Sequence, residues 1–229
     1  ELKGGCPECL RVEAAEREAN AQAAAAYEQR LSLTRKLGDA LIPLRFQSST
    51  LDNFRVEHGE QDRALKFCRH YVAEFDRIFE TGRCMALIGK PGTGKTHLGA
   101  AIANALLHTT PRTAVYRTVG AVLQAIKATF DRKSERSESD ILSSLVNPDL
   151  LVLDEIGVSK ENPSDFELTT LFAIINGRYE QRRPTVVITN LSAGQLPAAM
   201  GERCVDRLRE GGLIVVPFNW ESQRGKEGF

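Results

Sequence analysis

The sequence predicts an α/β fold in which a doubly wound, parallel five-stranded sheet follows an N-terminal helical arm. Two observations indicate the sheet: short apolar runs alternate with helical segments from about residue 60 onward, and a glycine-rich turn joins the first apolar run to a helix. Strands buried on both faces are continuously apolar, and helices cross between parallel strands. A third observation indicates the arm: residues 10–37 contain no proline or glycine.

The N-terminal arm is expected to be one long helix that follows a short loop, residues 1 to about 9, containing "CPEC". Residues 10–37 are rich in Ala, Glu, Arg and Gln, which favour helix. Their apolar stripe is thin, so the helix is either a solvated spacer or lies on a partner. Gly38 is expected to end it. We divide the chain into an arm of residues 1–40 and a domain of residues 41–229.

The domain is expected to alternate strands with helices. The predicted strands are 84–89, 113–118, 150–155, 185–190 and 212–218. The predicted helices are 60–76, 96–108, 119–130, 141–146 and 165–181, with short helices across 192–210. Because a helix lies between successive strands, the strands are expected to be parallel.

Composition excludes several classes of protein. The 229 residues include 30 Lys and Arg and 30 Asp and Glu, so any contact with nucleic acid must come from a local lining rather than from bulk charge. There is no apolar run of about 18 residues or more, so no membrane span is predicted. The five cysteines show no spacing typical of a disulfide framework, which fits a reducing, cytoplasmic setting.

A phosphate-binding loop is predicted at "GKPGTGKT", Gly89 to Thr96, which fits G-x-x-x-x-G-K-[ST] between an apolar strand and a helix. Its glycines let the backbone turn N–H groups and the helix N-terminus toward an anion. Lys95 is placed to reach the β- and γ-phosphates of ATP, and the Thr96 hydroxyl to ligate Mg²⁺. The candidate cofactor-binding residues are Gly89, Pro91, Gly92, Thr93, Gly94, Lys95, Thr96 and Asp154.

Polar side chains follow two other apolar strands, where ligands of an open α/β sheet bind. Asp154 and Glu155 end "LLVLDE": Asp154 is expected to hold Mg²⁺ with Thr96, and Glu155 to polarise an attacking water. The alternative is an acidic strand end that merely starts a loop. Asn190 ends "VVITN", where it either orients the water or touches the γ-phosphate, or simply starts a turn.

Arginines gather near the C-terminus, in "GERCVDRLREGGLIVVPFNWESQRG". Arg203 and Arg207 are one helical turn apart, and either could reach the ATP of a neighbouring subunit, where an arginine raises the rate of phosphoryl transfer. Alternatively they form surface pairs with Glu202, Asp206 and Glu210. Spacing by itself does not decide between these.

Five motifs, "GKPGTGKTHL", "LLVLDEIGV", "VVITN", "GERCVDRL" and "FNWESQR", occur in this order and spacing. Together they resemble the DnaC family of bacterial helicase loaders, within the initiator group of AAA+ P-loop ATPases, over roughly residues 43–224. The resemblance implies that Arg207 is the arginine finger and that Arg224 touches the γ-phosphate in cis. Arg203 lies in the same motif.

The same resemblance implies a helical insertion at about residues 119–147, which in such loaders lines a pore and contacts single-stranded DNA. Phe130, Lys127 and Lys133 are the candidates, since aromatic rings stack on bases and cations pair with phosphates. Phe130 could equally be a core residue of its helix. The stretch "FQSSTLDNF" resembles the family's segment at the adenine pocket, so Phe46 and Phe54 either face adenine or pack.

The "CPEC" motif resembles phage-type and prophage-type members. Cys6 and Cys9 can supply half of a tetrahedral zinc site, which needs four ligands. The remaining ligands would lie upstream of Glu1 or on another chain; the alternative is two free thiols. By analogy with loaders, residues 1–40 are expected to bind the replicative helicase.

Three functions follow as hypotheses. The first is an ATP-dependent loader that self-associates through its ATP sites, binds a DnaB-type hexameric helicase and delivers it onto single-stranded DNA. The second is an IstB-type transposition helper acting on duplex DNA. The third is a nucleotide-gated binding module with negligible turnover. The "FNWESQR" ending and the helical arm favour the loader, and Glu155 and Arg207 argue against the third.

Overall fold

The computed structural model describes residues 6–131, 133–157 and 163–225. The chain divides into two compact units, and the boundary between them in the sequence falls between Asp39 and Ala40. The first unit is formed by helix α1 (Pro7–Ala40). The prediction that Gly38 ends this helix was wrong. A single glycine costs only about 1 kcal/mol inside a helix, and no proline follows until the helix has ended.

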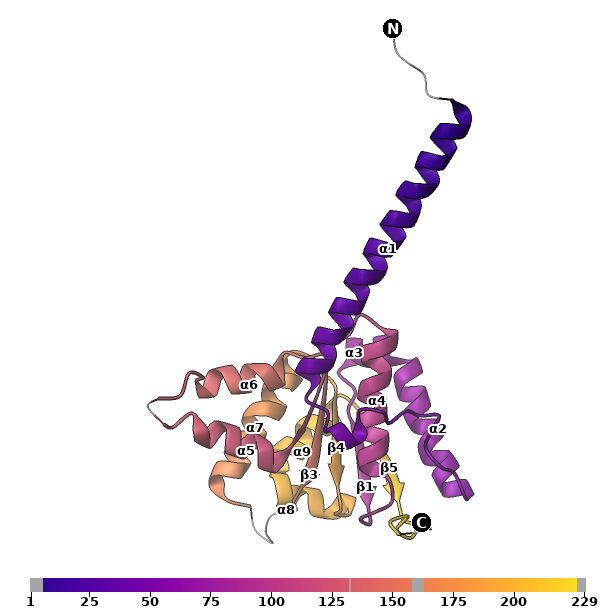
Figure 1. The fold of residues 1–229 in the computed structure, drawn as a ribbon. Coiled ribbons are helices and arrows are strands. Elements are labelled where there is room, and N and C mark those ends of the chain that lie inside the picture. Colours follow the sequence, from indigo (N-terminus) through magenta and orange to yellow (C-terminus); the bar gives the residue numbers. More distant parts are fainter. Residues whose placement is uncertain (1–5, 132, 158–162, 226–229) are drawn as a thin grey trace. The chain divides into compact units, whose positions relative to one another are not determined.

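The second unit contains the remaining elements (Figure 1). Its strands are β1 (Met85–Gly89), β2 (Ala114–Thr118), β3 (Leu150–Ile156), β4 (Thr185–Thr189) and β5 (Ile214–Phe218). Its helices are η1 (Leu44–Phe46), α2 (Gly59–Ala73), α3 (Phe75–Thr81), α4 (Lys95–Thr109), α5 (Val119–Ala128), α6 (Glu138–Val146), α7 (Asp165–Glu180), η2 (Ala193–Gln195), α8 (Leu196–Met200) and α9 (Glu202–Glu210). The predicted α/β alternation is confirmed, although the predicted helix 60–76 is divided into α2 and α3.

The strands form one five-stranded sheet in the order β2-β3-β4-β1-β5, and every pair of neighbours is parallel. This confirms the predicted doubly wound sheet. The strand order places β3 and β1 on either side of β4, so the carboxyl ends of three strands far apart in sequence lie together. In open parallel sheets, ligands bind at such an edge.

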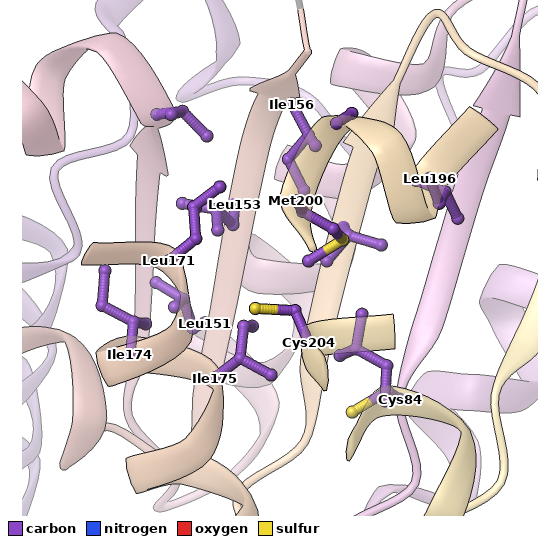
Figure 2. Packing of buried hydrophobic residues seen from close by; sticks show 14 of the residues in the cluster. Cys84, Leu151, Leu153, Ile156, Leu171, Ile174, Ile175, Leu196, Met200 and Cys204 are labelled. Carbon is purple, nitrogen blue, oxygen red and sulfur yellow. The ribbon is translucent and has the colours of Figure 1, made fainter. Parts of the chain in front are cut away.

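The sheet is covered on both faces, as its apolar strands require. Figure 2 shows the core on one face, where Leu151 and Leu153 of β3 lie near side chains of α7, α8 and α9. On the other face α4 lies close to the sheet at Gly99, which has no side chain. A Cβ added there would lie 2.4 Å from Ile188 Cδ1 of β4. None of the helices that the structure describes combines the length and apolar character needed to cross a membrane.

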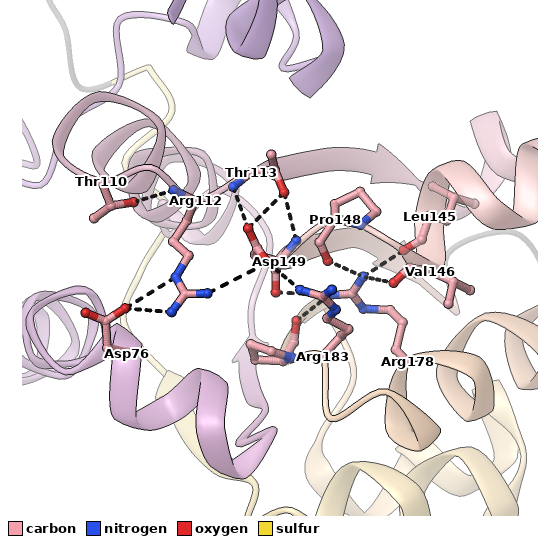
Figure 3. Close-up of polar contacts among 11 residues, drawn as sticks. Asp76, Thr110, Arg112, Thr113, Leu145, Val146, Pro148, Asp149, Arg178 and Arg183 are labelled. Carbon is pink, nitrogen blue, oxygen red and sulfur yellow. Dashed lines mark hydrogen bonds and ion pairs between the residues drawn. The ribbon is translucent and has the colours of Figure 1, made fainter. Parts of the chain in front are cut away.

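A buried arginine closes the end of the sheet opposite the carboxyl ends of the strands. Arg178 of α7 is 1% exposed, and its guanidinium makes hydrogen bonds with six acceptors. Figure 3 shows those to Leu145, Val146 and Pro148. The acceptors are Thr185 Oγ1 and the carbonyl oxygens of Leu145, Val146, Pro148, Asp149 and Pro184. Burial lowers the pKa of Arg178 to about 9. This one side chain therefore joins the end of α6 to the starts of β3 and β4.

Candidate functional site

A cavity of about 1100 Å³ opens at the carboxyl ends of the strands. Most of the predicted nucleotide-site residues line it: Pro91, Gly92, Thr93, Gly94, Lys95, Thr96, Asp154, Glu155, Asn190 and Arg224. A smaller cavity of about 350 Å³, whose lining includes Cys84 and Thr185 near the starts of β1 and β4, contains none of these residues. The larger cavity is therefore the candidate nucleotide site.

The phosphate-binding loop, residues 89–96, has the backbone geometry that anion binding needs. Gly92 and Gly94 have φ angles of 77° and 94°, in the left-handed region that favours glycine. Gly94 is the N-cap of α4, so the first N–H groups of that helix lie beside the loop. Loop amides and helix dipole together make an anion site.

Lys95 is buried at the centre of this loop. Its Nζ donates hydrogen bonds to the carbonyl oxygens of Gly89 at 2.7 Å and Lys90 at 2.5 Å. The pKa of Lys95 is lowered to about 8: burial lowers it most, the charge of Asp154 raises it, and the charge of Arg224 lowers it. A phosphate group in the cavity would add negative charge that favours the ammonium form.

Asp154 is buried and held from three sides. Thr96 Oγ1 donates to its Oδ2 at 3.0 Å, and the backbone N–H of Glu155 donates to its Oδ1 at 2.6 Å. The Tyr116 hydroxyl also donates to Oδ2. Burial, followed by the charge of Asp154, raises the pKa of Tyr116 above its usual range, so the phenol stays a donor. Thr96 and Asp154 thus present adjacent oxygens, the ligand type that Mg²⁺ prefers.

Tyr116 is a site residue that sequence reasoning missed. It lies on β2, opposite Val152 of β3 in the strand pairing. A polar aromatic residue in an apolar strand is a weak signal by itself. Its significance depends on β2 pairing with β3, which the sequence does not state.

Glu155 leaves the strand in a different direction from Asp154. The pairing of β3 with β4 shifts in register between Leu153 and Ile156, and Glu155 has a φ angle of 63°. A bulge of this kind redirects a side chain, and a left-handed non-glycine residue marks local strain. Asp154 is consequently buried while Glu155 is exposed at the cavity.

Asn190 and Arg224 complete the cavity rim, and both are exposed. Asn190 directly follows β4. Arg207 does not lie in this cavity but lines the smaller one at the other end of the sheet. The structure therefore brings together the predicted nucleotide-site residues except Gly89, which ends β1, and Arg207, whose role at a neighbouring subunit stays a prediction.

Arg207 makes contacts within its own chain. Its Cζ lies 4.4 Å from the centroid of the Tyr179 ring, and its Nη1 lies 3.2 Å from Glu210 Oε2. Glu210 also forms a side-chain hydrogen bond with Tyr179, and this bond raises the pKa of the Tyr179 hydroxyl. Arg203 is exposed, with its Cζ 5.9 Å from the centroid of the Phe172 ring. The surface pair predicted for Arg207 with Glu210 is thus present, and it does not exclude a second role.

The candidate DNA-contacting residues lie at the end of α5 and in the loop that follows. Phe130 is 63% exposed, so the alternative that it is a core residue was wrong. Its ring meets Phe166 edge to face at 6.1 Å, and Lys127 Nζ lies 5.5 Å from the Phe166 ring centroid. Lys133 is exposed in the loop before α6. Phe166, at the start of α7, thus lies beside two of these candidates.

The remaining candidates lie near the N-terminus and beside the loop. Phe46 and Phe54 both line the large cavity, and the Phe54 ring lies beside Gly94 and His97. Cys6 is exposed just before α1, and the side chain of Cys9 is outside the described part of the chain. Among the described residues, no group of three or more His, Cys, Asp or Glu side chains is arranged to hold a metal ion. The zinc half-site stays a prediction.

Comparison with known proteins finds similarity to a family of ATP-binding proteins and to replicative helicase loaders. The family model for IstB-like ATP binding proteins matches residues 13–227. The replicative helicase loader DnaC of Escherichia coli is 42% identical over 182 residues, which are 79% of this chain and 71% of that protein. The DnaC of Buchnera aphidicola subsp. Acyrthosiphon pisum is 34% identical over 195 residues, 85% of this chain and 76% of that protein.

Solved structures show the same similarity. The crystal structure of the DnaC helicase loader matches with a TM-score of 0.67 and 27% identity, over 76% of this chain and 99% of that chain. AMPPCP-bound DnaA from Aquifex aeolicus matches with a TM-score of 0.61 and 20% identity, over 77% of this chain and 51% of that one. The second match shows the fold alone.

Proposed function

The chain belongs to the IstB/DnaC family of ATP-binding proteins, and from this we propose that it is an ATP-dependent helicase loader that delivers a hexameric replicative helicase onto single-stranded DNA. The observation that carries the proposal is the 42% identity with DnaC, over 79% of the chain. The α/β domain is of the AAA+ type, like those of the DnaC and DnaA structures. We propose a cytoplasmic location, because its named relatives are replication proteins.

The alternative, a transposition helper acting on duplex DNA, has less support. The family model carries the IstB name, but the named relatives described above are replicative helicase loaders. A binding module without turnover is also less favoured, since Glu155 is exposed at the cavity beside the buried Asp154.

We propose that the cavity binds ATP with Mg²⁺ and hydrolyses it. The loop amides and Lys95 would bind the phosphates, while Thr96 and Asp154 would hold the ion through oxygens already 3.0 Å apart. Bound Mg²⁺ supplies positive charge that neutralises the phosphate oxygens. Glu155 is the proposed base that orients the attacking water. Asn190 and Arg224 would contact the γ-phosphate from the rim.

Exchanging Glu155 for glutamine is expected to leave ATP affinity within about threefold and to lower turnover by about 10²-fold, because a general base of this kind contributes roughly 10²–10⁴. Equilibrium binding and steady-state phosphate release would measure the two effects. The matched control is Glu60→Gln in the first turn of α2, which is exposed and should change neither quantity. Unchanged turnover in Glu155→Gln would exclude this residue as the base.

We propose that the two units have separate partners. Residues 41–229 would form the ATPase domain and self-associate through Arg207, while residues 1–40 would bind the helicase. Tyr27 and Leu31 of α1 are 65% and 40% exposed, and such apolar side chains are available to a partner. We also propose that Phe130, Lys127 and Lys133, within the 119–147 insertion, contact single-stranded DNA by stacking and by charge.

Mixing the protein with the replicative helicase of its host and ATP is expected to give a stable complex with about one copy per helicase subunit. Light scattering or native mass spectrometry would measure its mass. Deleting residues 1–39 should abolish it while leaving Ala40, which is fully buried in the second unit. The paired change Tyr27→Ala and Leu31→Ala should weaken it without unfolding. No complex, together with assembly on duplex DNA, would favour the transposition helper.

A further inference from the structure

From the last residue of β5, residues 218–224 run beside the phosphate-binding loop; we call them the C-terminal segment. Four hydrogen bonds join the two. Two are made by the backbone: the Lys90 N–H donates to the Phe218 carbonyl at 3.2 Å, and the Gln223 N–H donates to the Gly92 carbonyl at 2.8 Å. Two are made by side chains: the Trp220 indole Nε1–H donates to the Thr93 carbonyl at 3.1 Å, and Lys90 Nζ donates to Glu221 Oε1 at 2.8 Å.

These bonds meet a specific requirement of the loop. When a backbone N–H group points toward an anion, the carbonyl oxygen of the same peptide group points away from it and needs another donor. The carbonyls of Gly89 and Lys90 accept from Lys95 Nζ. Those of Gly92 and Thr93 accept from the C-terminal segment. The segment thus satisfies the outward side of the loop while its inward side stays available.

Trp220 is held tightly enough to direct its donor. The side chain is 5% exposed, and its ring packs on Phe218 at 4.7 Å between centroids and edge-on to His58 at 5.7 Å. The C-terminal segment lies so close to the loop that a Cβ added to Gly92 would be 2.1 Å from Ser222 Oγ. The position of the indole N–H is therefore determined by packing on both sides.

We propose that Trp220 is a positioning residue for nucleotide binding, which keeps the Thr93 carbonyl turned outward and so presents the loop amides to the phosphates. Arg224 belongs to the same segment, so loop and rim arginine are held as one unit. The inference rests on the proposed binding of ATP. It concerns a residue that touches the loop rather than the nucleotide.

Trp220 is the one tryptophan in the 229 residues, which permits a change of a single atom group. Production in a tryptophan auxotroph supplied with β-(3-benzothienyl)alanine replaces only this side chain and removes only its N–H. We expect ATP and ADP affinity to fall equally, by about tenfold, the size of effect expected when a buried carbonyl loses its donor. The thermal unfolding midpoint without nucleotide should fall by only about 2–6 °C, so the protein stays folded at the temperature of the binding measurement.

Trp220→Phe is the genetic counterpart, since it keeps aromatic packing on Phe218 and His58 while removing the donor. Arg224→Ala is the matched control: it should weaken ATP but spare ADP, because its proposed contact is with the γ-phosphate. Unchanged ATP affinity in both Trp220 variants would overturn the proposal. So would losses of affinity that merely follow losses of stability. If the unaltered protein binds no ATP, the proposed function fails and this inference fails with it.

Discussion

Replacing Arg207 with alanine is expected to lower the ATP turnover that depends on self-association and DNA by about 10³-fold. An arginine supplied by a neighbouring subunit raises the rate of phosphoryl transfer by roughly 10³–10⁵. The ATP affinity of the monomer should stay within about twofold, since Arg207 lies outside its own nucleotide cavity. Steady-state phosphate release with and without single-stranded DNA, alongside equilibrium ATP binding, would measure both quantities.

The matched control is Arg209→Ala, two residues along α9, which is exposed and has no proposed role. Glu210→Gln provides a test in the opposite direction. Its carboxylate now pairs with Arg207 at 3.2 Å and would compete with a neighbour's phosphate for the guanidinium. We expect this variant to retain or raise stimulated turnover. Normal stimulated turnover in Arg207→Ala would exclude the finger assignment.

Replacing Arg178 with methionine is expected to lower the free energy of unfolding by about 3–5 kcal/mol. The methionine chain fills part of the space, but the three fully buried acceptors, on Thr185, Leu145 and Pro184, lose their donors. Each such loss costs about 1–3 kcal/mol, and removing a buried charge offsets part of the sum. The total is a large share of the roughly 5–15 kcal/mol that stabilises a typical domain. Urea unfolding followed by circular dichroism would measure the change.

Arg183→Met is the control for this prediction, because Arg183 lies in the same region but is partly exposed and pairs mainly with Asp149. This pair is part-buried, and without it the Asp149 carboxylate still accepts hydrogen bonds from Thr113, so the expected loss is about 1–2 kcal/mol. ATP affinity of the folded Arg178→Met protein should be unchanged, since the network closes the opposite end of the sheet. A variant as stable as the unaltered protein would show that water or neighbouring donors satisfy these carbonyls.

Much of the fold could be predicted because its signals are local. Apolar runs marked the five strands, and helical spacing marked the helices between them. The errors were local as well. Gly38 did not end α1, since one glycine is a weak helix breaker. Strand β3 continued past Glu155 through a bulge that the residue types there do not predict.

The candidate site divides in the same way. Lys95, Thr96, Asp154 and Glu155 could be predicted, because each lies in a short contiguous motif whose residue types the chemistry requires. Tyr116 and Trp220 could not. The first acts through the strand beside its own, and the second acts on a loop more than a hundred positions earlier in the chain.

The sequence by itself determined the α/β class, the phosphate-binding loop and the resemblance to helicase loaders, because hydrophobic period and motif spacing are properties of neighbouring residues. The tertiary structure decided which strands are neighbours, and through them which side chains support the site. It also decided that Arg178 is buried among six acceptors and that Phe130 is exposed. Burial and long-range hydrogen bonding depend on what the rest of the chain brings near a residue, and no local pattern contains that information.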